Sequence, residues 1–206
     1  MEAPQKSSAT EATDRRIQRS NSALRNALLE LLVEKTFDRI SITELTARAG
    51  LSYTTFFRHF ASKEALLNDV ASSLIQDLLS LSVPIVSRAG RFASCRALCF
   101  YVYGKKELWR SLLTGGAAQT VQAEFVRQAR LWTPNFHWPH DWLPVDLGTI
   151  WSARGTIHIL SWWLEHEEDL SIDEVARIID RLVVQSISLS YPDKSRKKKR
   201  PRTAKS

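Results

Sequence analysis

Apolar positions along the chain recur at three- and four-residue spacing, the repeat of amphipathic helices. The first such stretch, from Asn21 to Lys35, carries Leu24, Ala27, Leu28, Leu31 and Leu32. Later stretches with the same repeat predict helices near residues 92–102, 105–113, 117–132, 145–166 and 172–189. No sustained segment alternates apolar and polar residues with the two-residue period of a strand. The pattern therefore predicts an all-α protein.

Two short helices separated by a tight turn are predicted after the first helix. Ser41 and Glu44 have capping-box spacing, in which each side chain accepts the backbone N–H of the other residue. Gly50 stands where a left-handed residue ends a helix, and Ser52 can cap a second short helix over residues 53–59. Two such helices joined by a turn with glycine, after a longer helix, describe a helix-turn-helix.

Breaks and further starts divide the rest of the chain. The Ser62-Lys63-Glu64 sequence predicts the start of a long helix that extends to about Leu81, and Pro84 is expected to end or bend it. Gly115-Gly116 predicts a break. Residues 133–144, which contain three prolines, predict a loop.

Composition and charge narrow the functional classes. A chain of 206 residues with 44% hydrophobic and 25% charged residues is typical of a folded protein with its own core. It contains two cysteines, too few for a disulfide scaffold, and no apolar run of the roughly 20 residues that a membrane span needs. We therefore expect a cytoplasmic, nucleoid-associated protein without a membrane partner. The net charge of +7 lies in residues 193–206, so it does not by itself indicate DNA binding by the folded part.

The helix-turn-helix carries a family resemblance. The segment Gly50-Leu-Ser-Tyr-Thr-Thr-Phe-Phe-Arg-His-Phe-Ala-Ser-Lys-Glu64 resembles the N-terminal signature of the TetR/AcrR family of bacterial transcriptional regulators. The similarity extends back to about Arg19, and residues 151–189 more loosely resemble the last two helices of many members. The expected organisation is a flexible basic arm (1–18), a three-helix DNA-binding domain (19–64), a larger helical ligand-binding and dimerisation domain (65–190) and a disordered basic tail (191–206).

The second short helix is the predicted DNA reader. Because the N-terminal residues of a helix in the major groove reach base edges, Tyr53, Thr54 and Thr55 are expected to contact bases. None of them can form the bidentate hydrogen bonds of Arg, Asn or Gln, so reading of G or A is left to Arg58 or to DNA shape. Phe57 stands where the family usually has a tyrosine whose hydroxyl contacts phosphate.

Other candidate DNA contacts surround this helix. The resemblance implies phosphate contacts for His59 and Lys63. Ser41 and Thr43, at a helix start, could bind phosphate, although Ser41 is also the predicted cap. Ser52 is a further candidate. Arginines of the arm could enter a minor groove or remain solvated, and these are Arg15, Arg16 and Arg19.

The resemblance also implies a homodimer and a small-molecule effector. The last two predicted helices carry more apolar residues than one intrachain face needs, and the predicted dimer residues are Trp162, Trp163, Ile178 and Leu182. Aromatic residues are enriched in the same region, which favours a pocket for a hydrophobic or aromatic molecule. The candidate pocket residues are Tyr101, Tyr103, Trp109, Phe125, Trp132 and Trp151.

Together these features predict a sequence-specific regulator, most simply a ligand-responsive repressor on a palindromic operator, that is not an enzyme and needs no cofactor. No phosphate-binding loop, dinucleotide motif or nucleophile elbow is present. His137, His140 and Asp141 give only a weak metal hypothesis, and Cys95 and Cys99 a weak hypothesis of oxidant sensing. The alternatives are a non-specific architectural protein driven by the basic tail, and a partner-docking or enzyme-like ligand-binding module with little DNA role.

Overall fold

The computed structural model describes residues 5–133, 142–166 and 170–188, and every regular element among them is helical. The first elements are α1 (Gln5–Glu34), the 3₁₀ turn η1 (Phe37–Arg39), α2 (Ile42–Ala49), α3 (Tyr53–His59) and α4 (Lys63–Ala89). They are followed by α5 (Arg91–Tyr103), α6 (Lys106–Thr114), α7 (Ala118–Trp132), α8 (Val145–Glu165) and α9 (Ile172–Ile179). The π-helical turn η3 (Asp180–Val184) and α10 (Gln185–Ser188) complete the series. The predicted all-α class is confirmed.

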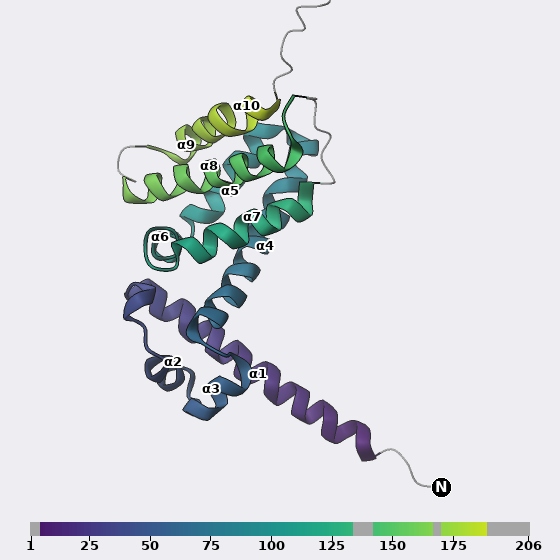
Figure 1. The fold of residues 1–206 in the computed structure, drawn as a ribbon, viewed down its shortest axis with the longest axis vertical. Helices are drawn as coiled ribbons and strands as arrows, with labels where there is room; N and C mark the ends of the chain where they lie inside the picture. The colour runs from purple at the N-terminus through teal and green to yellow at the C-terminus, as the bar shows by residue number, and fades with distance from the viewer. Residues whose placement is uncertain (1–4, 134–141, 167–169, 189–206) are drawn as a thin grey trace, which may run out of the picture.

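Residues 20–70 form a head, and residues 71–188 form a body (Figure 1). In the head, α1 packs against α2, α3 and the start of α4. The fully buried side chains between these helices include Leu24, Leu28, Leu45, Phe56 and Leu66. In the body, α4 packs against α5 and α7, while α8 and α9 close the other side. Because α4 belongs to both regions, it joins them covalently.

The helix starts in the head follow the predicted caps. The Ser41 Oγ accepts the N–H of Glu44, and a carboxylate oxygen of Glu44 accepts the N–H of Ser41. Gly50 ends α2 with φ 65°, a left-handed conformation that a residue with a Cβ atom rarely adopts. The Ser52 Oγ accepts the N–H of Thr55 at the start of α3. The two short helices of the motif are therefore confirmed.

The structure differs from the sequence-based expectations at three places. Helix α1 begins at Gln5, so most of the expected arm is helical, which its Ala, Gln, Glu and Arg content favours. Helix α4 continues past Pro84 to Ala89. The carbonyl that loses its hydrogen bond there belongs to Ser80, which is exposed and can bond to water. The helix expected over 172–189 contains the π-helical turn η3.

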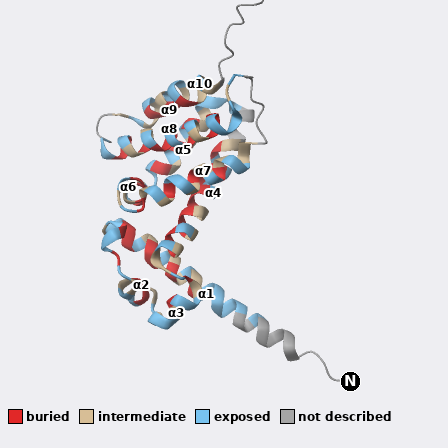
Figure 2. Ribbon diagram, in the orientation of Figure 1, coloured by how far each residue is buried: buried red, intermediate tan, exposed pale blue. Residues whose placement is uncertain are grey.

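Burial follows the two regions (Figure 2). Red buried segments line the facing sides of the helices in both head and body, whereas α1 is exposed at every described side chain from residue 14 to residue 19. The head therefore has a core of its own, and the N-terminal part of α1 projects beyond it.

Candidate DNA-binding helix and ligand pocket

Helix α3 is anchored by one face and exposed on the other. Phe56 and Phe60, four residues apart, are buried against the head core. On the opposite side Tyr53 is 54% exposed and Phe57 is 45% exposed, and their rings lie 5.1 Å apart. The exposed face of α3 therefore presents aromatic surface, which is unusual for a monomer unless a partner covers it.

The threonine hydroxyls of α3 are engaged within the helix. The Ser52 Oγ lies 3.0 Å from the Thr54 Oγ1 and 2.9 Å from the Thr55 Oγ1, in addition to capping the helix. Among the described residues of α3, Arg58 is the only exposed cation. The Ser and Thr hydroxyls at the start of α3 therefore bond to one another, and the Tyr53 and Phe57 side chains form the neighbouring exposed surface.

The side chains of His59 and Lys63 point into the protein. The Lys63 Nζ donates to the carbonyls of Phe37 (3.2 Å) and Ile40 (3.0 Å) and lies 4.6 Å from the centre of the Phe37 ring. These carbonyls account for a cation in the first turn of α4. His59 is half-buried, its Nε2 has no hydrogen-bond partner among the described residues, and burial and then Arg58 lower its pKa. Their expected phosphate contacts remain predictions.

The remaining candidate DNA residues have mixed positions. Ser41 is occupied as the cap of α2, and Thr43 is exposed in its first turn. Arg15, Arg16 and Arg19 are exposed on α1 instead of lying on an irregular arm. In helix α1 these three arginines, spaced by one, three and four residues, lie towards one face, so they do not form the extended chain that typically enters a minor groove.

The head is the part of the chain that known proteins share. Residues 24–70 match the family described as bacterial regulatory proteins, tetR family. The helices of the head are therefore similar to those of this family of regulators. Two curated relatives, both uncharacterised HTH-type transcriptional regulators of Bacillus subtilis (strain 168), agree: YxbF is 40% identical over 55 residues and YvdT is 36% identical over 53 residues. Each alignment covers 26% of this chain, and it spans 14% of YxbF and 27% of YvdT. Relatives and family are transcriptional regulators, not enzymes.

Solved TetR-type structures extend the likeness to the whole fold. A TetR transcriptional regulator from Streptococcus agalactiae 2603V aligns with a TM-score of 0.64 and 19% identity, over 84% of this chain and 98% of that one. The FadR repressor of Thermus thermophilus, solved with lauroyl-CoA, aligns with a TM-score of 0.58 and 17% identity, over 84% and 97% of the two chains. At these identities the likeness establishes the shared fold alone.

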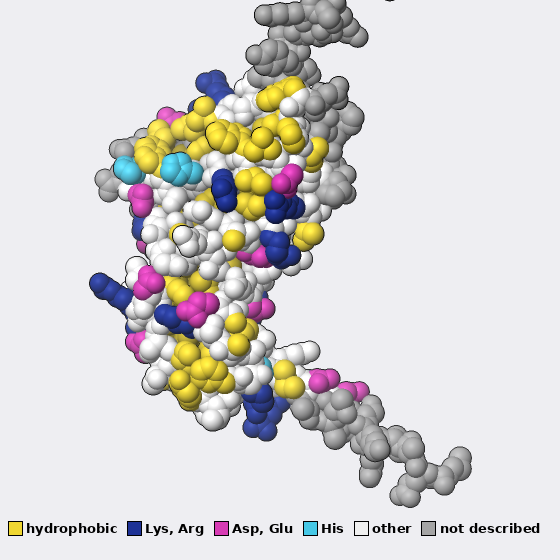
Figure 3. All heavy atoms as spheres, in the orientation of Figure 1, with side chains coloured by type: hydrophobic (Ala, Val, Ile, Leu, Met, Phe, Trp, Pro, Cys, Tyr) yellow, Lys and Arg dark blue, Asp and Glu magenta, His cyan; other side chains and the backbone are white. Residues whose placement is uncertain are grey.

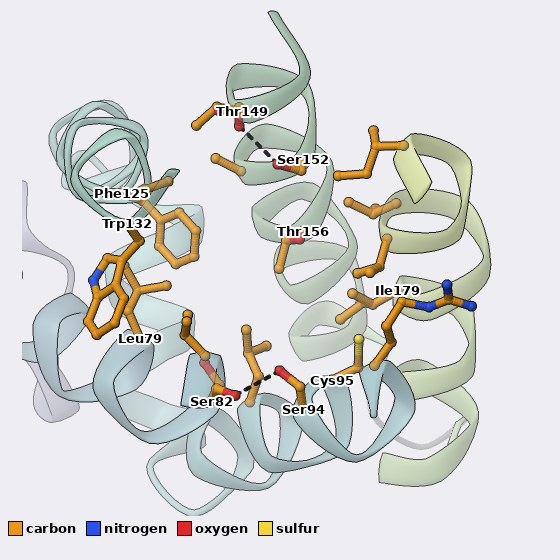
Figure 4. Close-up of a pocket in the computed structure, with 18 of the residues that line it drawn as sticks. Leu79, Ser82, Ser94, Cys95, Phe125, Trp132, Thr149, Ser152, Thr156 and Ile179 are labelled. Carbon is orange, nitrogen blue, oxygen red and sulfur yellow. Dashed lines mark hydrogen bonds between the residues drawn. The ribbon is translucent and has the colours of Figure 1, made fainter. Parts of the chain in front are cut away.

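The body contains a pocket of about 360 Å³ between α4, α5, α7, α8 and the α9–α10 segment (Figure 4). Apolar side chains, including alanine and cysteine, form most of its wall. The residues that line it include Leu79, Leu98, Phe125, Ala129, Trp132, Ala153, Thr156, Ile179 and Val183. This volume lies in the lower part of the range for small-molecule sites.

Most polar groups in the pocket wall already have partners. The Ser82 Oγ donates to the Leu78 carbonyl, the Ser94 Oγ donates to the Ser82 carbonyl, and the Thr149 Oγ1 donates to the Val145 carbonyl. The only charged side chain of the wall is Arg91, whose Nε lies 3.4 Å from a carboxylate oxygen of Asp180. The pocket therefore offers apolar surface and few free hydrogen-bonding groups.

Only two of the six predicted pocket aromatics, Phe125 and Trp132, line this cavity. Trp109 is fully buried elsewhere in the core, with the Tyr101 ring 6.3 Å from its own. Tyr103 stacks on Trp163 at 5.4 Å, and Trp151 is exposed on α8. The prediction rested on the enrichment of aromatic residues, which does not indicate which side chains point into a pocket. It missed the small residues of α5 and α8 that create the space.

The cysteines are unsuited to oxidant sensing. Both are free and buried, and burial raises the pKa of each thiol to about 12. Reactive cysteines require the opposite shift. His137, His140 and Asp141 lie outside the described residues, and within the described part no group of three or more His, Cys, Asp or Glu side chains is placed to hold a metal.

An exposed apolar band covers α8 and η3 (Figure 3). Its largest exposed side chains are Leu147, Trp151, Trp162 and Leu182. Ile178 is half-buried on α9. Trp163, predicted at the dimer face, is instead fully buried, and its Nε1 donates to the Leu170 carbonyl, so it is not available to a partner. None of the helices in the described part combines the length and hydropathy that a membrane span requires.

Proposed function

We propose that this protein is a DNA-binding transcriptional regulator, and specifically a ligand-responsive repressor that binds a palindromic operator as a homodimer. The observation that carries the proposal is the capped, exposed helix α3 within a head that matches the tetR family. A single α3 can read only a few base pairs, and two-fold dimers of helix-turn-helix proteins place two such helices one DNA turn apart.

Helix α3 reads thymine methyl groups rather than purine edges. Its threonine hydroxyls bond to Ser52, while the Tyr53 and Phe57 rings and the Thr54 side chain are exposed. Apolar contact from a Thr methyl or an aromatic ring is a known way of recognising the thymine methyl. Arg58 supplies the remaining polar contact at the C-terminal end of the helix.

Selection of bound duplexes from a random pool at about 150 mM salt tests the DNA-binding function, since lower salt favours the basic tail. We expect an enriched inverted repeat with thymines in each half-site. Replacement of those thymines by uracil, which lacks the methyl, should weaken binding by about fourfold for each methyl contacted. A chain truncated before residue 194 serves as the control. Loss of all binding on truncation, or binding without enrichment, would favour the tail-driven alternative.

The effector is an uncharged, mainly apolar molecule. Within the wall described above, the hydroxyls of Ser82, Ser94 and Thr149 bond to helix carbonyls, and the only charged wall residue, Arg91, already faces Asp180. A charged group placed deep in this pocket would lose its hydration without gaining a partner. Among relatives of the fold, FadR was solved with lauroyl-CoA, and NalD is a repressor of a multidrug efflux pump.

Two dyes with the same aromatic body test this ligand class. We expect N-phenyl-1-naphthylamine, which is neutral, to bind and to quench tryptophan fluorescence, whereas 8-anilinonaphthalene-1-sulfonate should bind at least about tenfold more weakly. Ala153→Phe fills the pocket and should abolish binding of the neutral dye, while Ala123→Phe, on the exposed side of α7, should not. Equal binding of the two dyes would contradict the proposal.

The apolar band on α8 and η3 is the proposed dimer face. Leu182→Glu should convert a dimer into monomers in analytical ultracentrifugation, because it places a charge on a face that the partner would desolvate. Leu131→Glu is the matched control, since Leu131 on α7 is 65% exposed and Leu182 is 62% exposed. A dimer that survives Leu182→Glu would place the interface elsewhere. The direction of regulation needs a reporter assay, since DhaS, which shares the fold, is an operon activator.

A further inference from the structure

A carboxylate of the head reaches across to the body at a single backbone amide. The Oδ2 of Asp38, in the turn η1, accepts the N–H of Gly116 at 3.2 Å. Gly116 lies two residues before α7, whose N-cap position, Ala117, offers no side-chain hydrogen bond of its own. The first N–H groups of a helix lack partners within the helix and carry a partial positive charge. Asp38 therefore binds the turn that precedes α7 and places a negative charge from the other region of the protein near the positive end of this helix.

The turn that carries Asp38 is itself tied to both regions. Phe37 is buried, and the Lys63 Nζ, at the start of α4, donates to the carbonyls on either side of Asp38. From the body, the Ser111 Oγ of α6 lies 3.4 Å from the Lys35 carbonyl that it donates to. The turn η1 is thus a junction at which the end of α1, the start of α4 and the α6–α7 connection meet (Figure 1).

The Asp38 carboxylate lies directly against Gly116. A Cβ atom added to Gly116 would overlap this carboxylate, whereas at the other glycine of the pair, Gly115, it would approach the Ser111 carbonyl at 3.1 Å. Gly116 has no positive φ that would require a glycine. Because Asp38 is exposed, its side chain can move aside, so an added methyl at Gly116 would break the hydrogen bond without straining the backbone.

Helix α7 connects this contact to the pocket. Phe125 lies nine residues beyond Gly116, about 14 Å along the helix axis, and with Ala129 and Trp132 it forms part of the pocket wall. Three residues beyond Phe125, the Gln128 Nε2 donates to the Ser72 carbonyl of α4 at 2.7 Å. One end of α7 thus lines the ligand site while the other end holds the head.

We infer that Asp38 is a positioning residue that fixes the angle of the head on the body, and that α7 transmits ligand occupancy to that angle. Helix α4 and the packing of α1 on α6 connect the head to the body. The Asp38–Gly116 hydrogen bond attaches the head at a further place, the start of α7, and so limits the tilt that the other contacts allow. The role in DNA binding rests on the proposed function, whereas the attachment of the head does not.

A double-mutant cycle tests the inference in the full-length chain. Asp38→Ala removes the acceptor, and Gly116→Ala displaces the carboxylate without demanding a forbidden backbone conformation. Spin labels at Ala47→Cys in α2 and Ala123→Cys in α7, both exposed, report the angle of the head by electron–electron distance measurement, while the native cysteines are buried. Gly104→Ala, where an added Cβ meets only ordinary contacts, is the matched control.

We expect a narrow distance distribution in the parent chain and a clearly broader one in either single variant, with the double variant no broader than the singles. Operator affinity should fall by about three- to tenfold in each single variant and no further in the double. The neutral dye should also change operator affinity less in these variants than in the parent. Unchanged distributions, or additive effects in the double variant, would overturn the role of Asp38.

The two readouts separate the inference from the proposed function. If the parent chain selects no DNA sequence, the proposed function fails, and the distance distributions still decide whether Asp38 holds the head. If Asp38→Ala broadens the distribution but leaves operator affinity and its response to the dye unchanged, the attachment stands and its regulatory role is overturned.

Discussion

The head and the body solve different packing problems with the same kind of helix. The head closes short helices around fully buried side chains such as Phe56, and its caps set each helix start. The body assembles longer helices around a pocket of about 360 Å³. A well-packed interior leaves few voids larger than a water molecule. The residues around a pocket of this size therefore lack packing contacts that a filled core would provide. The head is therefore built to hold one surface in place, and the body is built to leave room.

This difference explains why the sequence match to the family is confined to the head. The family match ends at residue 70, near the point where α4 leaves the head. A surface that fits a DNA groove restricts the side chains that can support it, because the groove has the same dimensions for every regulator. A pocket must instead change with its ligand. We expect sequence divergence to follow the pocket wall more closely than the head core.

The largest expected effect is the loss of stability of the head alone when a buried ring is removed from its core. Phe56→Ala removes a fully buried ring from the head core and should cost about 3–5 kcal/mol of head stability. All seven tryptophans lie in the body, at or beyond residue 109, so their fluorescence should change little while hydrogen exchange in the head accelerates. Phe57→Ala, next to it but exposed, is the control. Simultaneous loss of the tryptophan signal would show that head and body unfold as one unit.

Enlarging a side chain should lower the stability more in the head core than in the pocket wall of the body. Ala27→Phe adds a ring to the packed head and should destabilise it by about 1–3 kcal/mol. Ala153→Phe adds the same ring beside the pocket, where space exists, and should cost less than about 1 kcal/mol. Urea unfolding followed by circular dichroism measures both. A cost for Ala153→Phe equal to that of Ala27→Phe would indicate that the pocket wall does not accept added volume.

Acid should loosen each region through a carboxylate of its own. Hydrogen bonds with Lys35 and Ser41 hold the pKa of Glu44 in the head at about 2, and Arg127 does the same for Glu124 in the body. Both values lie below that of an unfolded glutamate, so the stability they provide is present above about pH 4.3 and is lost as the pH falls towards 2. Hydrogen exchange at several pH values should show Glu44→Gln flattening the acid response of the head alone, and Glu124→Gln that of the body alone. A response of both regions to one substitution would argue that they titrate as a unit.

The smallest expected effect concerns the two buried cysteines, whose thiols should not react with an alkylating reagent while the body is folded. With a pKa of about 12, about one Cys95 or Cys99 thiol in ten thousand is ionised at pH 8. We therefore expect negligible labelling by iodoacetamide until urea unfolds the body. Rapid labelling of the native protein would show that the α5 side of the pocket opens readily.

The sequence predicted local features well and long-range ones poorly. The start of α2 and the bounds of α3 follow from caps that involve residues three positions apart, and the structure has them as expected. The continuation of α4 past Pro84 depends on solvent at Ser80, which the sequence does not display. The inward direction of Trp163 follows from tertiary packing, in which its Nε1 donates to the Leu170 carbonyl, and helical periodicity alone did not distinguish it from the exposed Trp162.

The candidate sites show the same division. The sequence identified the exposed start of α3. It did not show that the hydroxyls of Ser52, Thr54 and Thr55 would bond to one another. Lys63 was predicted as a phosphate ligand, and the structure shows it bound to carbonyls of η1, which no helical pattern indicates. Asp38 gave no sequence signal, because its partner Gly116 is 78 residues away.

The contacts of the head have a consequence for how the chain is made. Helix α1 packs on α2, α3 and the start of α4, all of which are present once residue 70 has been synthesised, whereas its contacts with α6 of the body form later. The capping box at Ser41 and Glu44 favours a helix start before any distant contact forms. Because domains generally fold in order of synthesis, we expect the head to close on the ribosome before α7 emerges to bind Asp38. Assembly then ends with the docking of a finished head onto the body.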